Sequence, residues 1–207
     1  MRAPSLTVFG MVGSLRRASF NSMLMRRAEA LAPDGVAFDI FADLGALPHF
    51  SQDREGDLTP PEVLDLTARL GNADAILVAT PEYNSAMPGV LKNALDWASR
   101  PPGRSVLAGK PAAAIGASPG RFGAQRAQAE VRKVLTAIGA NVLDHELPVP
   151  RAHEVFDEHG RILDEEQERR LAALVASLVE LARTQVLGEP TDSAAYSLEC
   201  QRRAVAG

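Results

Sequence analysis

Short apolar runs alternate with amphipathic stretches along this chain, and together they predict alternating strands and helices. The apolar runs have the length and composition of strands that are buried on both faces. They cover residues 6–12, 36–41, 75–80, 111–117 and 141–147. Helical periodicity is found over residues 19–31, 61–70, 88–99, 124–138 and 165–184. Thr59 is the candidate N-cap of the helix that begins at Pro61.

This alternation predicts an α/β fold, in which helices cover both faces of a parallel five-stranded sheet. Right-handed crossovers between parallel strands place helices on either side of the sheet, which gives three layers. At 207 residues the chain is long enough for one such domain. We expect the domain to occupy residues 1–187. Residues 188–207 lack sustained periodicity, and we expect them to form a flexible C-terminal tail.

Composition and charge favour a small-molecule partner. The net charge is −4 and the pI is about 5.6, whereas a nucleic-acid surface needs clustered Lys and Arg. The single cysteine, Cys200, excludes an intramolecular disulfide framework. The sequence has no separate apolar signal region and no run long enough to span a bilayer. We therefore expect a cytoplasmic protein that binds neither nucleic acid nor membrane.

The loop after the first predicted strand has the donors that a phosphate needs. Residues 13–21 combine serine hydroxyls, an amide and a guanidinium with the N–H groups of a helix start. The alternative is a surface turn in which Ser19 or Asn21 only caps the helix. Two other phosphate motifs fit less well. The dinucleotide fingerprint needs three spaced glycines, and only Gly10 and Gly13 precede the helix here. In the nucleotide-triphosphate loop the final Gly-Lys is followed by Ser or Thr, whereas Gly109-Lys110 is followed by Pro111.

Two further loops leave what should be the same edge of the sheet. In residues 81–84 an aromatic ring, Tyr83, stands between polar groups after a buried strand, which suits a flat heteroaromatic ligand. The loop after the fourth strand offers Ser118, Gly120 and Gly123, and glycine there permits close backbone approach. Taken alone, this third loop is better explained as a plain connection between a strand and a helix.

These residues resemble the NADPH-dependent FMN reductase family of flavodoxin-like proteins, which includes quinone, chromate and azo-dye reductases. Residues 13–21 match the family's G-S-x-R-x-x-S-x-N loop, and residues 81–84 are followed by the family's Pro-Gly and by Leu-Lys-Asn-Ala-Leu-Asp-Trp. The resemblance implies a sheet in the order 2-1-3-4-5 and a homodimer or homotetramer. It also implies that NADPH passes hydride to N5 of bound FMN, and that electrons then pass to a quinone, azo compound, metal oxyanion or free flavin.

The resemblance further implies a set of FMN-binding residues. The phosphate would be held by Ser14, Arg16, Ser19 and Asn21, with backbone contacts from Phe20 and Ser22. The flavin ring would lie against Pro81, Glu82, Tyr83 and Asn84, and its far side against Ser118 and Gly120. Residues of the following helix would fix the loop or lie in the core or a subunit interface, namely Lys92, Asn93, Asp96 and Trp97, with Arg100 at an interface.

Alternative functions remain at this point. A non-catalytic flavodoxin-like electron carrier would have the same fold and cofactor. A flavin-free protein resembling a receiver domain would need carboxylates where Gly13 and Ser14 stand. The four histidines lack the spacing of metal ligands, so no metal site is expected. A flavin carries its own chemistry, so no catalytic side chain is predicted. Arg16 and Arg17 are candidates to attract the extra phosphate of NADPH.

Overall fold

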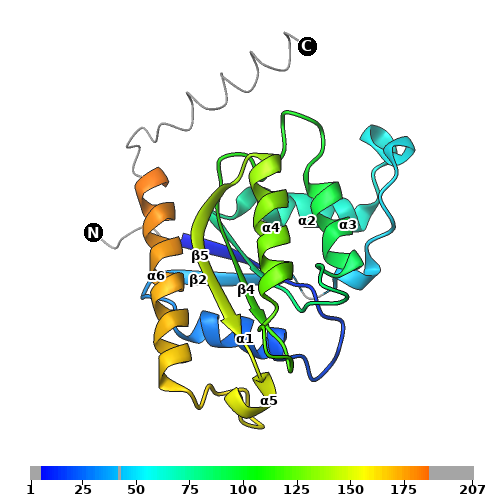
Figure 1. Cartoon of the computed structure of the whole chain (residues 1–207). Coiled ribbons are helices and arrows are strands. Elements are labelled where there is room, and N and C mark those ends of the chain that lie inside the picture. Colours follow the sequence, from blue (N-terminus) through cyan, green and yellow to red (C-terminus); the bar gives the residue numbers. More distant parts are fainter. Residues whose placement is uncertain (1–5, 42, 187–207) are drawn as a thin grey trace.

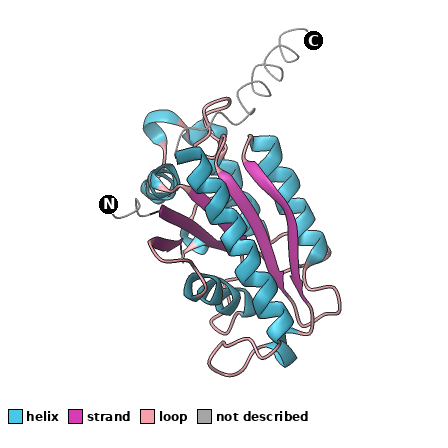
Figure 2. Cartoon of the chain, turned by 90° about the vertical axis from the view of Figure 1, so that its left-hand side faces the viewer, coloured by secondary structure: helices cyan, strands magenta, loops and turns pink. Residues whose placement is uncertain are grey.

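The computed structural model describes residues 6–41 and 43–186, and these form a three-layer α/β/α sandwich (Figure 1). A view turned by 90° shows that helices flank the central sheet on both sides (Figure 2). The sheet is parallel throughout and has the order β2-β1-β3-β4-β5, which confirms the predicted fold and strand order. The strands are β1 (Leu6–Val12), β2 (Val36–Phe41), β3 (Ala75–Ala79), β4 (Pro111–Ala117) and β5 (Asn141–Val149). The predicted tail, including Cys200, lies outside the described residues.

Every predicted helix is present, and its ends lie within two residues of the expected ones. The α-helices are α1 (Phe20–Ala30), α2 (Pro61–Asn72), α3 (Gly89–Ala98), α4 (Gln125–Ile138), α5 (Ala152–Val155) and α6 (Glu165–Val186). The short α5 and three 3₁₀ turns, at 44–46, 52–54 and 56–58, were not predicted. The cap prediction was wrong, because Pro60 occupies the N-cap position of α2. The Thr59 hydroxyl donates instead to the Gly56 carbonyl at 2.8 Å.

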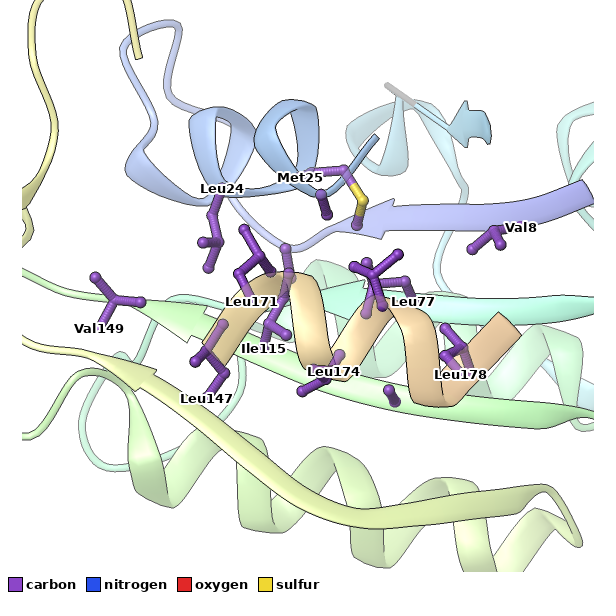
Figure 3. Close-up of a cluster of buried hydrophobic side chains, with 14 of the residues drawn as sticks. Val8, Leu24, Met25, Leu77, Ile115, Leu147, Val149, Leu171, Leu174 and Leu178 are labelled. Carbon is purple, nitrogen blue, oxygen red and sulfur yellow. The ribbon is translucent and has the colours of Figure 1, made fainter. Parts of the chain in front are cut away.

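The sheet separates two apolar clusters, because successive strand residues point to opposite faces. Val8 of β1 packs in the cluster beneath α1 and α6, whereas its neighbour Phe9 packs in the cluster beneath α2, α3 and α4. On the first face, α6 lays Leu171, Leu174 and Leu178 over the strands (Figure 3). Burial on both faces explains why the strands read as nearly continuous apolar runs.

The carboxyl end of β4 comes close to β3 and to α4. A Cβ on Gly116 would lie 2.8 Å from the Thr80 carbonyl oxygen and 2.9 Å from Nε2 of Gln128, so no side chain fits at this position. Gln128 is fully buried and donates to the Gly123 carbonyl, while its side-chain oxygen accepts from the Leu147 N–H. The first turns of α4 are thereby held beside the ends of β3 and β4.

Candidate functional site

The loops after β1 and β3 touch each other at the carboxyl edge of the sheet. The Gly13 N–H donates to the Ala79 carbonyl at 2.9 Å. A Cβ at position 13 would lie 3.2 Å from Leu91 and 3.3 Å from Pro81, which is closer than ordinary van der Waals contact. Because β1, β3 and β4 are neighbours in the sheet, the loops that follow them share this edge, as predicted.

The loop after β1 presents the first turn of α1. Ser19 is the N-cap, and its hydroxyl accepts from the Ser22 N–H at 3.3 Å, so the capping interpretation describes this side chain correctly. The N–H groups of Phe20 and Asn21 belong to the first turn and have no acceptor within the helix. They leave the positive end of the α1 dipole available to an anion.

Arg16 adds a positive charge to this loop. Its guanidinium donates to the Ala18 carbonyl at 3.3 Å, and its N–H donates to the Ser14 hydroxyl at 3.4 Å. Within residues 6–41 and 43–186, no carboxylate lies within 4.0 Å of the Arg16 guanidinium. The loop therefore combines hydroxyls, helix N–H groups and a cation that no acid neutralises, a donor set that fits a phosphate monoester.

Asn21 makes contacts that the motif did not foresee. Its side chain is buried, with 3% exposed, and it bonds the backbone of Ala117 at the end of β4. The amide nitrogen donates to the Ala117 carbonyl, and the amide oxygen accepts from the Ala117 N–H, both at 2.9 Å. This side chain ties α1 to β4.

The loop after β3 forms a tight hairpin turn. Tyr83 and Ala86 exchange two backbone hydrogen bonds, of 3.0 and 3.1 Å. The two central residues, Asn84 and Ser85, have φ values of 52° and 66°, the left-handed pair that a type I′ turn requires. Ser85 is not a residue type that this backbone favours. The hairpin leaves the Tyr83 side chain 49% exposed.

Helix α4 anchors the hairpin through its first turns. Oε2 of Glu82 accepts from the N–H groups of Arg126 at 2.9 Å and Ala127 at 3.3 Å. Glu82 thus caps α4, whose own N-cap residue, Ala124, has no polar side chain. The side chain that the resemblance placed against the flavin ring points to a helix terminus instead.

Two more hydrogen bonds hold the hairpin to α4. A carboxylate oxygen of Glu130 accepts from the Met87 N–H at 2.6 Å. The Arg126 guanidinium donates to the Ser85 hydroxyl at 2.8 Å. Sequence reasoning missed both anchors, because the partners are 43 and 41 residues apart and neither pair belongs to a motif.

The loop after β4 is fixed on one side and open on the other. The Ser118 N–H donates to the Val149 carbonyl at 3.1 Å, and the Gly120 carbonyl accepts from the Arg151 N–H at 3.1 Å. A Cβ on Gly120 would meet only the Ser118 hydroxyl, at 3.4 Å, so this glycine leaves space beside the loop. Gly123 differs, because its Cβ would lie 2.5 Å from the Val149 nitrogen and its close approach is to β5.

Residues of α3 anchor a different loop from the one expected. Asn93 accepts from the Phe50 N–H at 2.8 Å and donates to the Pro48 carbonyl at 3.0 Å. Trp97 is buried, and its Nε1 donates to the same carbonyl at 2.8 Å. These side chains therefore fix the long loop between β2 and α2 rather than the hairpin after β3.

The charged residues of α3 also form pairs within the chain. Lys92 and Asp96 form an ion pair of 2.6 Å one turn apart. Arg100 pairs with Glu55 at 2.7 Å, and its guanidinium lies 5.6 Å from the Phe50 ring centroid. The interface role expected for Arg100 stays a prediction.

Two features are absent from the described ranges, 6–41 and 43–186: a cluster of metal-binding side chains and a helix that could cross a membrane. No group of three His, Cys, Asp or Glu side chains in these ranges has the arrangement of a metal site. None of the helices there combines the length and the apolar composition that crossing a bilayer requires.

Known proteins resemble this chain over most of its length. Residues 6–154 match the model of the NADPH-dependent FMN reductase family. An NAD(P)H-dependent FMN reductase of Pseudomonas aeruginosa is 44% identical over 77% of this chain and 86% of its own length. A 2-hydroxy-1,4-benzoquinone reductase of a Burkholderia species is 43% identical over 81% of this chain and 91% of its own length. A flavoenzyme NAD(P)H:(acceptor) oxidoreductase of Paracoccus denitrificans superposes with a TM-score of 0.77 at 38% identity, covering 86% of this chain and 98% of that one.

These relatives are enzymes, which confirms the predicted enzyme class and leaves the electron-carrier alternative with less support. The predicted cofactor FMN, with NAD(P)H as electron donor and a small molecule as acceptor, is confirmed in the same way. The chain therefore belongs to the NADPH-dependent FMN reductase family.

Proposed function

We propose that this enzyme reduces a quinone with electrons from NAD(P)H, using FMN bound where β1, β3 and β4 end. The observation that carries the proposal is the loop after β1, with its unneutralised Arg16 and free helix N–H groups, in contact with the aromatic hairpin after β3. The choice of a quinone is supported by the 43% identical 2-hydroxy-1,4-benzoquinone reductase.

The loop after β1 fits the FMN phosphate. We assign the phosphate to the hydroxyls of Ser14 and Ser19, the Arg16 guanidinium and the N–H groups of Phe20 and Asn21. The Ser19 hydroxyl accepts from Ser22, and its proton remains free to donate to a phosphate oxygen. The Ser22 N–H is already bonded to Ser19, which makes it the weakest member of the predicted set.

The other two loops fit a flat ring. We assign the flavin ring to Pro81, Tyr83 and the backbone of Asn84, with Ser118 and Gly120 on its far side. Glu82 would contribute its backbone only, because its carboxylate caps α4. The two α4 anchors would keep this wall in place before the ring binds, so less ordering is needed on binding.

Once bound, FMN would accept hydride and pass electrons on, which is chemistry that the side chains do not supply. The chain's contribution is to hold the phosphate, orient the ring and leave one face open to the nicotinamide and the quinone in turn. Arg16 and the positive end of α1 would balance the charge of the phosphate, and the rigid hairpin would set the position of the ring.

We also propose a homodimer or homotetramer in the cytoplasm. The exposed aromatic side chain of Tyr83 supports an assembly, because such side chains are enriched at subunit interfaces. The single cysteine fits a reducing compartment. Light scattering coupled to size exclusion measures the mass, and a monomer at micromolar concentration would contradict the assembly.

The decisive experiment is a steady-state panel of acceptors on FMN-loaded protein. Quinones, azo dyes, metal oxyanions and free flavin would each be tested with NADPH and with NADH, and bound FMN would be measured by its absorption spectrum. We expect a benzoquinone to give the largest kcat/KM. Bound FMN without turnover of any acceptor would contradict the enzyme proposal, and faster reduction of another class would reassign the acceptor.

A further inference from the structure

A cluster of two arginines and one aromatic ring lies after β4, outside the assigned FMN contacts. The Arg121 guanidinium carbon is 4.5 Å from the centroid of the Phe122 ring, and that of Arg126 is 5.6 Å from the same centroid. Phe122 is 46% exposed. We call these three residues the 121–126 cluster.

The charge of this cluster is not neutralised by a nearby acid. In the described part of the chain, no carboxylate lies within 4.0 Å of the guanidinium of Arg121 or Arg126. The side chain of Arg126 donates to a neutral hydroxyl, that of Ser85. Two positive charges therefore lie close to one exposed ring, an arrangement that attracts an anion carried by a flat group.

The position of Arg126 also conflicts with helix stability. It lies in the first turn of α4, where the helix dipole is positive and a cation is unfavourable. Glu82 offsets this in part by accepting the N–H groups of Arg126 and Ala127. A residue that is unfavourable for its own helix is more often found where function requires it.

The cluster adjoins the wall assigned to the flavin ring. Arg126 bonds the hairpin at Ser85 through its side chain and at Glu82 through its N–H, and the same hairpin presents Tyr83. The cluster thus forms an exposed rim beside this wall, on the segment that follows β4 and not on the phosphate loop that follows β1. A dinucleotide whose nicotinamide meets the flavin must extend its adenosine end toward the rim.

We propose that the 121–126 cluster binds the 2′-phosphoadenosine end of NADPH. The arginines would take the 2′-phosphate, and Phe122 would stack on the adenine. The proposal rests on the proposed function and extends it, because it gives this enzyme a structural reason to prefer NADPH to NADH. It also moves the extra phosphate of NADPH away from Arg16 and Arg17, the two candidates that the sequence suggested.

Direct binding tests the cluster without turnover. Isothermal titration would measure the affinity of adenosine 2′,5′-bisphosphate and of 5′-AMP for FMN-loaded protein, in which FMN already occupies the phosphate loop. We expect Arg121→Ala to weaken the bisphosphate about ten-fold, by loss of one charge-assisted contact, and to leave 5′-AMP unchanged. Arg121→Lys should retain part of the affinity. Phe122→Ala should weaken both nucleotides.

Arg104→Ala is the matched control, because Arg104 is exposed, has no carboxylate within 4.0 Å among the described residues and follows α3 in the chain. If Arg104→Ala weakened binding of the bisphosphate as much as Arg121→Ala does, the effect would come from net charge alone, and the proposal would be overturned. The same holds if Arg17→Ala abolishes the preference for the bisphosphate while Arg121→Ala does not.

Kinetics with the two donors provides the second test. Arg121→Ala should raise the KM for NADPH about ten-fold and leave the KM for NADH unchanged. The proposal would be overturned if Arg121→Ala raised the KM for NADPH and for NADH equally. It would also be overturned if Phe122→Ala changed the oligomeric mass and affected the KM for both donors equally. If the protein turns over no acceptor but still discriminates the bisphosphate through Arg121, the proposed function fails while the nucleotide site stands.

Discussion

The loops that follow β1 and β3 leave the same edge of the sheet, but their polar groups form hydrogen bonds to different partners. In the β1 loop, Arg16 and Ser14 bond to neighbours within the loop and to no other residue in the described part of the chain. In the β3 loop, Glu82 bonds the start of α4, while Ser85 and Met87 accept and donate bonds to side chains of the same helix. One loop keeps its polar groups for a ligand, and the other uses them to fix its own shape.

This difference separates two ways of building a cofactor site. A phosphate is recognised by charge and by hydrogen-bond donors, so the loop that holds it must leave donors unpaired. A flat ring is recognised by shape, so its wall must be rigid before the ring arrives. Asn21 has a third role, because its side chain joins α1 to the end of β4. Substitutions can test each role separately.

Asn21→Ala should cause the largest effect, because it breaks the buried bridge between α1 and the end of β4. The buried N–H and carbonyl of Ala117 would lose their partners, and each unpaired buried group costs about 1–3 kcal/mol. We expect the free energy of unfolding to fall by about 2–4 kcal/mol, together with weaker FMN binding. Urea titration with and without FMN measures both. Ser22→Ala is the neighbouring control, and equal destabilisation by it would argue against a special role for the bridge.

Arg16→Ala should weaken FMN binding without destabilising the apoprotein. Loss of a charge-assisted bond to the phosphate costs about 1.5–3 kcal/mol, which raises the FMN Kd roughly 10- to 150-fold. The exposed Arg16 contributes nothing to the core, so unfolding of the apoprotein should stay unchanged. Fluorescence titration of FMN measures the Kd, and Arg17→Ala is the matched control. An identical Kd change in both variants would show a general effect of charge.

The sheet could be predicted from the sequence, because strands buried on both faces leave short apolar runs that are hard to mistake. The first and last residues of helices and strands were less predictable, because hydrogen bonds of polar groups determine where these elements begin and end. Thr59 has the residue type of a helix N-cap, but its hydroxyl donates to the Gly56 carbonyl in the preceding 3₁₀ turn. Pro60 therefore occupies the N-cap position of α2. The last residues of β5, Pro148 and Val149, pair with Gly116 and Ala117 of β4, although the sequence predicted that this strand ends at residue 147.

The candidate site was predictable by position and less so by contact. The motifs correctly placed three loops at one edge, since strand order follows from the fold. They did not show that Asn21 bonds Ala117 or that Glu82 caps α4, because such contacts join residues far apart in the chain. The same is true of Glu130, which no motif includes.

Glu82→Ala should change turnover more than FMN affinity. Removal of this cap exposes the α4 N–H groups, which costs about 0.5–2 kcal/mol of stability, and releases one anchor of the hairpin. We expect kcat with a quinone to fall while the FMN Kd rises less than in Arg16→Ala. Stopped-flow and fluorescence measurements separate the two, and the exposed Glu180→Ala is a control. A Kd increase as large as that of Arg16→Ala would mean that the Glu82 carboxylate contacts the cofactor.

Arg69→Met should give the smallest effect and tests whether mere destabilisation can imitate the loop variants. Nε of Arg69 bonds Asp39 at 3.0 Å, and this hydrogen bond lowers the pKa of the Asp39 carboxyl. A lowered folded-state pKa stabilises the protein above the ordinary value of about 3.9, and the stabilisation is lost as pH falls through the lowered pKa. Because the pair is about one-third exposed, we expect a loss of about 0.5–1 kcal/mol at pH 7.

The pH dependence of this loss shows its cause and sharpens the comparison of the two loops. Urea titrations at several pH values should show the difference between Arg69→Met and the unmodified protein shrinking below about pH 4. A constant difference would instead point to the contact of Arg69 with the Phe41 ring, 5.0 Å away. In either case the FMN Kd should stay unchanged at pH 7. If it rose as far as in Glu82→Ala, the hairpin anchors would matter only through overall stability, and the distinction between a donor loop and a rigid wall would fail.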